Sequence, residues 1–136
     1  MFKKIAVCLL MGLALAFAGC KKDAEINATL TELDSFTKEL VQKVETAQGA
    51  PEGIDAAQQF LDSKKSDLKK RLDELKSLRG FQMSDATKKT LTESFTKNAT
   101  QVMSLQIKYV SRSVKDSNYK AKLEKLINDY RTLLTA

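Results

Sequence analysis

Apolar side chains recur every three or four residues over most of the chain after residue 23, which is the spacing of one face of an α-helix. The first stripe predicts a helix over about residues 24 to 47, and we expect Gly49, Pro51 and Gly53 to stop it. Its inward side chains are Ile26, Leu30, Leu33, Phe36, Leu40, Val41 and Val44. The helix therefore begins almost directly after Cys20.

A second stripe predicts a helix that ends near residue 78. Its inward residues are Ala57, Leu61, Leu68, Leu72, Leu75 and Leu78, and lysines alternating with acidic residues between them predict a solvated outer face. Asp55 is the expected N-cap, because its carboxylate can accept from the free amides of the first turn. Gly80 is expected to end the helix in the left-handed conformation, with Phe81 folding back on the last turn.

A third helix is expected after Ser84, which can cap it. One face carries Leu91, Phe95, Ala99, Val102, Leu105 and Tyr109. A flank on another side widens the apolar surface, so we expect this helix to be buried on two sides. The alternative is that the flank is an exposed interaction surface, formed by Thr96, Thr100, Met103 and Ile107.

Polar residues between 111 and 118 predict a helix break, with Asp116 or Ser117 capping a fourth helix. The inward residues of this helix are Tyr119, Leu123, Leu126, Ile127, Tyr130, Leu133 and Leu134. Four helices with short connections predict an all-α fold, an antiparallel up-down helical bundle over residues 24–136. A three-helix arrangement with one long bent helix is the main alternative.

The composition removes most catalytic chemistry. The chain of 136 residues has no histidine and only two cysteines, Cys8 and Cys20. Motifs for phosphate loops, zinc, calcium or an activated serine are missing, and the neighbouring carboxylates at 34 and 39 and at 73 and 74 resemble surface charge. We therefore expect no enzyme, no metal and no cofactor.

Charge is uneven along the chain, whose formal net charge is +6. Without Lys3 and Lys4, 21 basic residues face 17 acidic ones, which is ordinary for a globular domain and does not indicate nucleic-acid binding. The first helix is acidic, with six carboxylates against two lysines between residues 23 and 47. We expect lateral ion pairs between it and basic neighbours, and the alternative is a basic surface that faces an anionic partner.

The first twenty residues predict a lipoprotein export signal, and the alternatives are an ordinary secretory signal with a coincidental cysteine and an uncleaved membrane anchor. Two lysines precede an uncharged apolar run from Ile5 to Ala18, which at fourteen residues is short for a membrane span. The sequence Phe17-Ala18-Gly19-Cys20 then resembles the lipobox of bacterial lipoproteins, with Phe17 in place of the usual leucine. The resemblance covers residues 1–20 only.

This resemblance implies cleavage between Gly19 and Cys20 and a diacylglyceryl thioether on the Cys20 sulfur. Residues 1–19 would then be the signal peptide and residues 20–23 the lipidated N-terminus, which anchors the chain to a membrane. Lys21 stands where lipoproteins retained in the inner membrane carry aspartate, which favours the outer membrane if the cell has two. Two or three acyl chains hold a protein to a bilayer effectively permanently.

These features predict a lipid-anchored, non-enzymatic helical module of the bacterial cell envelope that acts through contact with an envelope protein. The alternative is a carrier or sensor of a small apolar ligand, bound between the third and fourth helices. Its expected lining is Phe95, Met103, Tyr109, Tyr119 and Tyr130. The first function needs an exposed apolar patch, and the second needs a continuous cavity.

Overall fold

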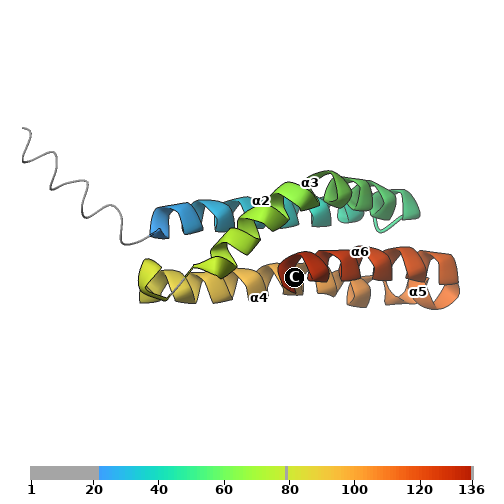
Figure 1. Cartoon of the computed structure of the whole chain (residues 1–136). Coiled ribbons are helices and arrows are strands. Elements are labelled where there is room, and N and C mark those ends of the chain that lie inside the picture. Colours follow the sequence, from blue (N-terminus) through green and yellow to red (C-terminus); the bar gives the residue numbers. More distant parts are fainter. Residues whose placement is uncertain (1–21, 79, 136) are drawn as a thin grey trace, which may run out of the picture.

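The computed structural model describes residues 22–78 and 80–135, and this part of the chain is an all-α bundle (Figure 1). Its elements are α2 (Asp23–Thr46), α3 (Pro51–Ser77), the 3-10 turn η1 (Gly80–Gln82), α4 (Asp85–Lys108), α5 (Val110–Lys115) and α6 (Ser117–Thr135). Four of these helices are long, as the sequence predicts, and no strand occurs among the described residues. The separate α6 excludes the three-helix alternative.

The turn between α2 and α3 uses the left-handed conformation that Gly49 allows. Gln48 and Gly49 have φ of 50° and 68°, and the Gly49 amide donates to the Val44 carbonyl at 2.9 Å, which satisfies the end of α2. A Cβ atom on Gly49 would lie 2.2 Å from the Tyr109 ring. Position 49 therefore requires glycine for two reasons: the backbone is left-handed, and the Tyr109 ring leaves no room for a Cβ atom.

Two expectations about the start of α3 are wrong. Pro51 and Gly53 do not separate the helices but begin α3, because a proline at the first helical position loses no hydrogen bond. Asp55 is not the N-cap, since Ala50 takes that place without a side-chain bond. The Asp55 carboxylate instead accepts from Lys122 Nζ at 2.6 Å and joins α3 to α6.

The end of α3 also differs from the prediction. The helix ends at Ser77 because Leu78 adopts an extended backbone, with φ −68° and ψ 139°. Gly80 starts the 3-10 turn instead of capping the helix. Phe81 is 73% exposed, so its ring does not fold back on the last turn.

Helix α4 begins where the sequence predicts, with the Ser84 hydroxyl accepting from the Thr87 amide at 3.2 Å. Its core face is rotated from the expected one. Val102 and Leu105 are buried, but Leu91, Phe95, Ala99 and Tyr109 are only partly buried, and polar side chains fill the rest of the buried face. The helix is thus not buried on two sides, and its far side is open.

Tyr109 separates α4 from α5, and α5 ends at Asp116. The Asp116 carboxylate accepts from the amides of Asn118 and Tyr119 at 2.9 and 3.1 Å, which confirms this residue as the cap of α6. The predicted inward residues of α6 are all buried. The break therefore falls inside the predicted interval, at its C-terminal end.

The four long helices alternate in direction, in agreement with an up-down course, but consecutive helices α3 and α4 lie diagonally across the bundle. Helix α2 packs on α3 and α4, and α6 packs on the same two (Figure 1). Contacts between α2 and α4 join residues about equally far along each helix, such as Asp34 with Lys97 and Glu45 with Lys108. Helices α2 and α4 therefore run parallel.

Helix α6 is shorter than its neighbours. It has 19 residues against 27 in α3. Figure 1 shows that its C-terminal end lies about halfway along the bundle. The half of the bundle near the start of α2 consists of α2, α3 and the first part of α4. Over the described residues, no helix combines the length and apolar character that a bilayer span requires.

Candidate interaction surface

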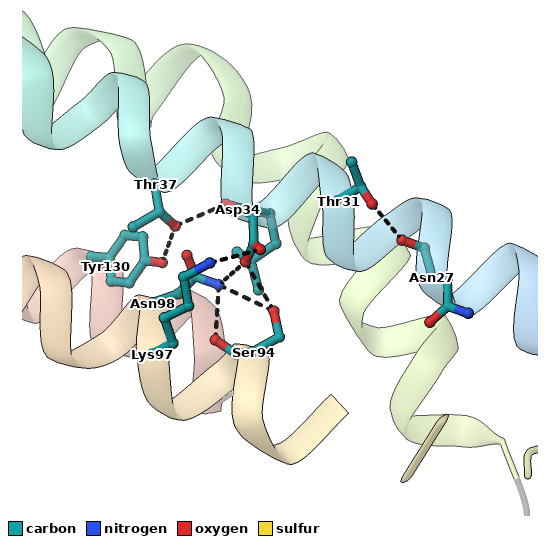
Figure 2. A network of polar contacts seen from close by, with 9 residues as sticks. Asn27, Thr31, Asp34, Thr37, Ser94, Lys97, Asn98 and Tyr130 are labelled. Atoms are coloured by element: carbon teal, nitrogen blue, oxygen red, sulfur yellow. Dashed lines mark hydrogen bonds and ion pairs between the residues drawn. The ribbon is translucent and has the colours of Figure 1, made fainter. Parts of the chain in front are cut away.

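A partly buried polar link connects α2 to α4. The Asp34 carboxylate of α2 accepts hydrogen bonds from Asn98 Nδ2 at 2.5 Å, Ser94 Oγ at 3.0 Å and Lys97 Nζ at 3.1 Å (Figure 2). Asn98 is fully buried and Ser94 nearly so. These polar side chains occupy the face of α4 where the sequence predicts Leu91 and Phe95.

The same contacts set the charge of Asp34. Burial alone would raise its pKa, but the hydrogen bonds from Asn98, Lys97 and Ser94 and the charge of Lys97 together lower it below the ordinary 3.8. The carboxylate is ionised at neutral pH and holds three donors. It is therefore a structural tie and a poor proton acceptor.

We expect Asp34→Asn to lower the free energy of unfolding at pH 7 by about 1 to 2 kcal/mol, since it weakens hydrogen bonds to a charged group. The folded-state pKa is depressed, so this contribution is present above the unfolded pKa of 3.8 and is lost as the pH falls through the folded value. Urea unfolding at pH 7 and at lower pH should show the difference between wild type and variant shrinking in acid.

The control is Glu39→Gln, which removes a more exposed carboxylate of the same helix, paired with Lys43. Exposed pairs contribute little, so this variant should unfold like the wild type at both pH values. A loss in Asp34→Asn that stays constant from neutral to acidic pH would contradict the assignment.

A second polar contact lies one turn further along α2. The Thr37 hydroxyl donates to the Leu33 carbonyl at 2.8 Å, so the Tyr130 hydroxyl, 2.5 Å away, is left as the donor to Thr37 (Figure 2). Burial raises the pKa of Tyr130 to about 12, with the Thr37 hydrogen bond acting in the other direction. The Tyr130 ring also stacks on Phe36 at 6.4 Å.

Ion pairs surround this interior, as the acidic first helix predicts. Glu32 pairs with Arg71 of α3, and Asp34 and Glu45 pair with Lys97 and Lys108 of α4. All three pairs are half exposed, so each contributes little to stability. These pairs do neutralise part of the negative charge of α2 with positive charges of α3 and α4.

The predicted flank of α4 lies on the molecular surface. Met103 is 46% and Ile107 79% exposed, and Thr96 and Thr100 are exposed beside them. Two residues of α5 extend the same row, Val110 at 51% and Val114 at 81%. We call these six residues the α4–α5 stripe: Thr96, Thr100, Met103, Ile107, Val110 and Val114.

Most of the exposed large hydrophobic side chains lie on this stripe. Five large hydrophobic side chains are exposed in the described part of the chain, and four of them are members. Val110 and Val114 were not predicted to belong to this flank, because the polar residues from 111 onward predicted an earlier helix break. The signal was the regular spacing of apolar residues that continues past Tyr109.

A groove adjoins the distal end of the stripe. It has a volume of about 420 Å³ and lies between the end of α4, α5 and the start of α6. Val110 and Val114 line it together with Leu123 and polar residues. The stripe is thus continuous with a concave surface.

The five residues expected to line a ligand cavity do not share one. Tyr119 and Tyr130 are buried in the core, whereas Met103 is half exposed on the opposite side of α4. Phe95 lines a different groove of about 320 Å³, between α3 and α4 beyond the end of α6, with Leu75 and Leu91. Packing of Tyr119 and Tyr130 into the core therefore separates them from Phe95 and Met103 in the described chain.

The described residues contain no group of three or more cysteine, aspartate or glutamate side chains placed to hold a metal ion. Gly19 and Cys20, the predicted cleavage and lipid-attachment residues, lie outside the described residues. Their role stays a prediction from the lipobox.

No family model, no curated protein and no solved structure matches this chain.

Proposed function

We propose that this protein is a lipid-anchored, non-enzymatic module of the bacterial cell envelope that acts through protein contact at the α4–α5 stripe. The observation that carries the proposal is the gathering of four of the five exposed large hydrophobics of the described chain on one row. Contiguous exposed apolar patches mark interaction sites, because leaving them in water costs free energy. The lipobox supplies the anchor.

The fold places the proposed lipid anchor far from the exposed hydrophobic end of the α4–α5 stripe. The start of α4 lies beside the start of α2, since the Lys22 amide donates to the Gln82 carbonyl at 2.7 Å and the Ser84 amide donates to Asp23. Ile107 lies 22 residues further along α4, about 33 Å at 1.5 Å per residue. An anchor at Cys20 would hold the bundle near the membrane and present the stripe away from it.

The two rival functions have less support. The strongest carboxylate site, Asp34, is ionised and held by three donors, which suits a structural tie better than catalysis. The small-ligand function requires a cavity that the five expected residues do not form. The contact function uses surface that the structure leaves open.

Site-specific photo-crosslinking in intact cells tests the proposal. A photoreactive residue at Ile107 or Val114 should give a protein adduct, because both side chains are highly exposed on the stripe. Lys64, exposed on α3, is the matched control and should give no comparable adduct.

Ile107→Asp should abolish the adduct formed from Val114 while the circular dichroism spectrum stays that of the wild type. A buried core position would not tolerate this change, but Ile107 is 79% exposed. Equal adducts from Val114 and Lys64, or none at either position, would contradict the contact function.

A further inference from the structure

A single residue joins α5 to α6. Helix α5 ends at Lys115, α6 begins at Ser117, and between them only Asp116 leaves helical geometry, with φ −137° and ψ 108°. The Asp116 amide still donates to the Arg112 carbonyl at 2.9 Å, and the Lys120 amide donates to the Asp116 carbonyl at 3.0 Å, both with the spacing of an α-helix. A backbone rotation at Asp116 would therefore convert the hairpin of α5 and α6 into one continuous helix.

The surface of α2, α3 and α4 against which α6 packs is specific for α6, and we call it the α6 site. Seven side chains of α6 are buried there. Polar contacts fix the register of the helix, because the Tyr130 hydroxyl bonds Thr37 of α2 at 2.5 Å and the Asp129 carboxylate accepts from Gln58 of α3 at 2.9 Å. The helix that fits this site is therefore α6 of the same chain or α6 of a second copy.

The segment next to the hinge is poorly covered in a single bundle. None of the six side chains of α5 is buried. Val110 is 51% and Val114 81% exposed. The closed hairpin thus leaves both valines largely in water.

We propose that two copies of this chain exchange α6 and form a domain-swapped dimer, with Asp116 as the hinge. Each α6 leaves its own bundle and occupies the α6 site of the other copy. Every contact of α6 is formed again between the two chains, so the exchange costs only the change at the hinge and the association of the copies. A hinge of one residue favours such an exchange.

The exchange also covers the exposed part of α5. In the dimer the two hinges lie side by side at the two-fold axis, so α5 of one copy adjoins α5 of the other and both can bury Val110 and Val114. This new contact offsets part of the cost of association, because it removes apolar surface from water. The exchange requires neither the lipid anchor nor the proposed contact with an envelope protein, so its failure would leave both untouched.

Cysteine crosslinking between two differently tagged chains tests the exchange. Asp55 of α3 and Lys122 of α6 pair at 2.6 Å, so Asp55→Cys in one chain and Lys122→Cys in the other face each other only when α6 is exchanged. The two full chains are expressed together, extracted with detergent and treated with a bismaleimide. The chains with their natural cysteines alone set the background.

The matched control is Glu32→Cys in one chain with Arg71→Cys in the other. These residues also form an ion pair between neighbouring helices, but both helices lie outside the exchanged segment. The mixed dimer from Asp55→Cys and Lys122→Cys should exceed that of the control by at least about tenfold, because the two cysteines are held at a high effective concentration. Equal amounts from the two pairs would overturn the exchange.

Variants of the hinge should shift the ratio of dimer to monomer. The Asp116 carboxylate caps the separate α6 through the amides of Asn118 and Tyr119, so Asp116→Ala destabilises the closed hairpin and not a continuous helix. A lost cap of the usual strength changes an equilibrium about fivefold, so the ratio at a fixed concentration should rise at least about fivefold. Three glycines inserted between Lys115 and Asp116 should lower the ratio, because glycine disfavours a continuous helix.

Size-exclusion chromatography with light scattering measures this ratio in detergent, and circular dichroism checks the fold of each variant. A folded Asp116→Ala chain with an unchanged ratio would overturn Asp116 as the hinge. If this variant does not fold, the crosslinks of the chains with the natural hinge still decide whether α6 is exchanged.

Discussion

Tyr130→Ala should lower the free energy of unfolding by about 3 to 5 kcal/mol, the usual cost of deleting a large buried aromatic side chain. Tyr130 is fully buried, stacks on Phe36, and its hydroxyl bonds Thr37 of α2. The change leaves a cavity between α2 and α6, and domains of this size have only about 5 to 15 kcal/mol in total. Urea unfolding followed by circular dichroism measures the loss.

Two further variants separate the contribution of the Tyr130 hydroxyl from that of its buried ring. Tyr130→Phe keeps the ring and removes the hydroxyl, so it should cost about 1 kcal/mol, the net contribution of one hydrogen bond. Phe95→Ala removes a ring that lies half-buried in the α3–α4 groove, and its loss should be clearly smaller than that of Tyr130→Ala. Equal losses at positions 95 and 130 would mean that the core is not centred where the structure places it.

Cys20→Ser should move the protein from the membrane fraction to the wash after carbonate extraction. The lipobox assigns the diacylglyceryl group to this sulfur, and each buried methylene contributes about 0.8 kcal/mol to membrane binding. Mass spectrometry of the wild type should find an N-terminal peptide that begins at Cys20 and carries acyl chains.

The matched control is Ile107→Asp, which should remain in the membrane fraction because the anchor is intact. Retention of Cys20→Ser in washed membranes, or an unmodified N-terminus elsewhere, would contradict the lipid assignment. Anchoring and contact at the stripe are thus tested by separate residues.

Helical periodicity predicted the four long helices because most inward side chains are aliphatic and lie on one side of each. It failed at the α2–α3 turn, where Pro51 and Gly53 were interpreted as breakers. The same residues serve the first turn of α3, and Gly53 also allows close packing, since a Cβ there would lie 2.6 Å from the Ala47 side chain. In the sequence alone, proline and glycine that begin a helix cannot be distinguished from proline and glycine that end one.

Helix α4 shows a second limit of sequence reasoning. Hydropathy places Ser94 and Asn98 outside and Phe95 inside. The structure instead buries Ser94 and Asn98 and leaves Phe95 only partly buried, because Asp34 of the neighbouring helix binds both polar residues. A partner 60 or more positions away is not visible in the periodicity of α4. The sequence predicted the exposed flank of α4. Its continuation to Val110 and Val114 could not be predicted without knowing where the helix breaks.

The parallel course of α2 and α4 has a mechanical consequence. A pull between the proposed anchor before α2 and the proposed contact at the end of α4 would load the α2–α4 interface in shear. Its bonds are spread along the full length, from Lys22 with Gln82 through Asp34 with Asn98 to Glu45 with Lys108. They would share the tension together instead of opening one after another, so the rate of forced unfolding should be low. If both proposals hold, the parallel pair α2 and α4 would carry the load between the anchor and the contact.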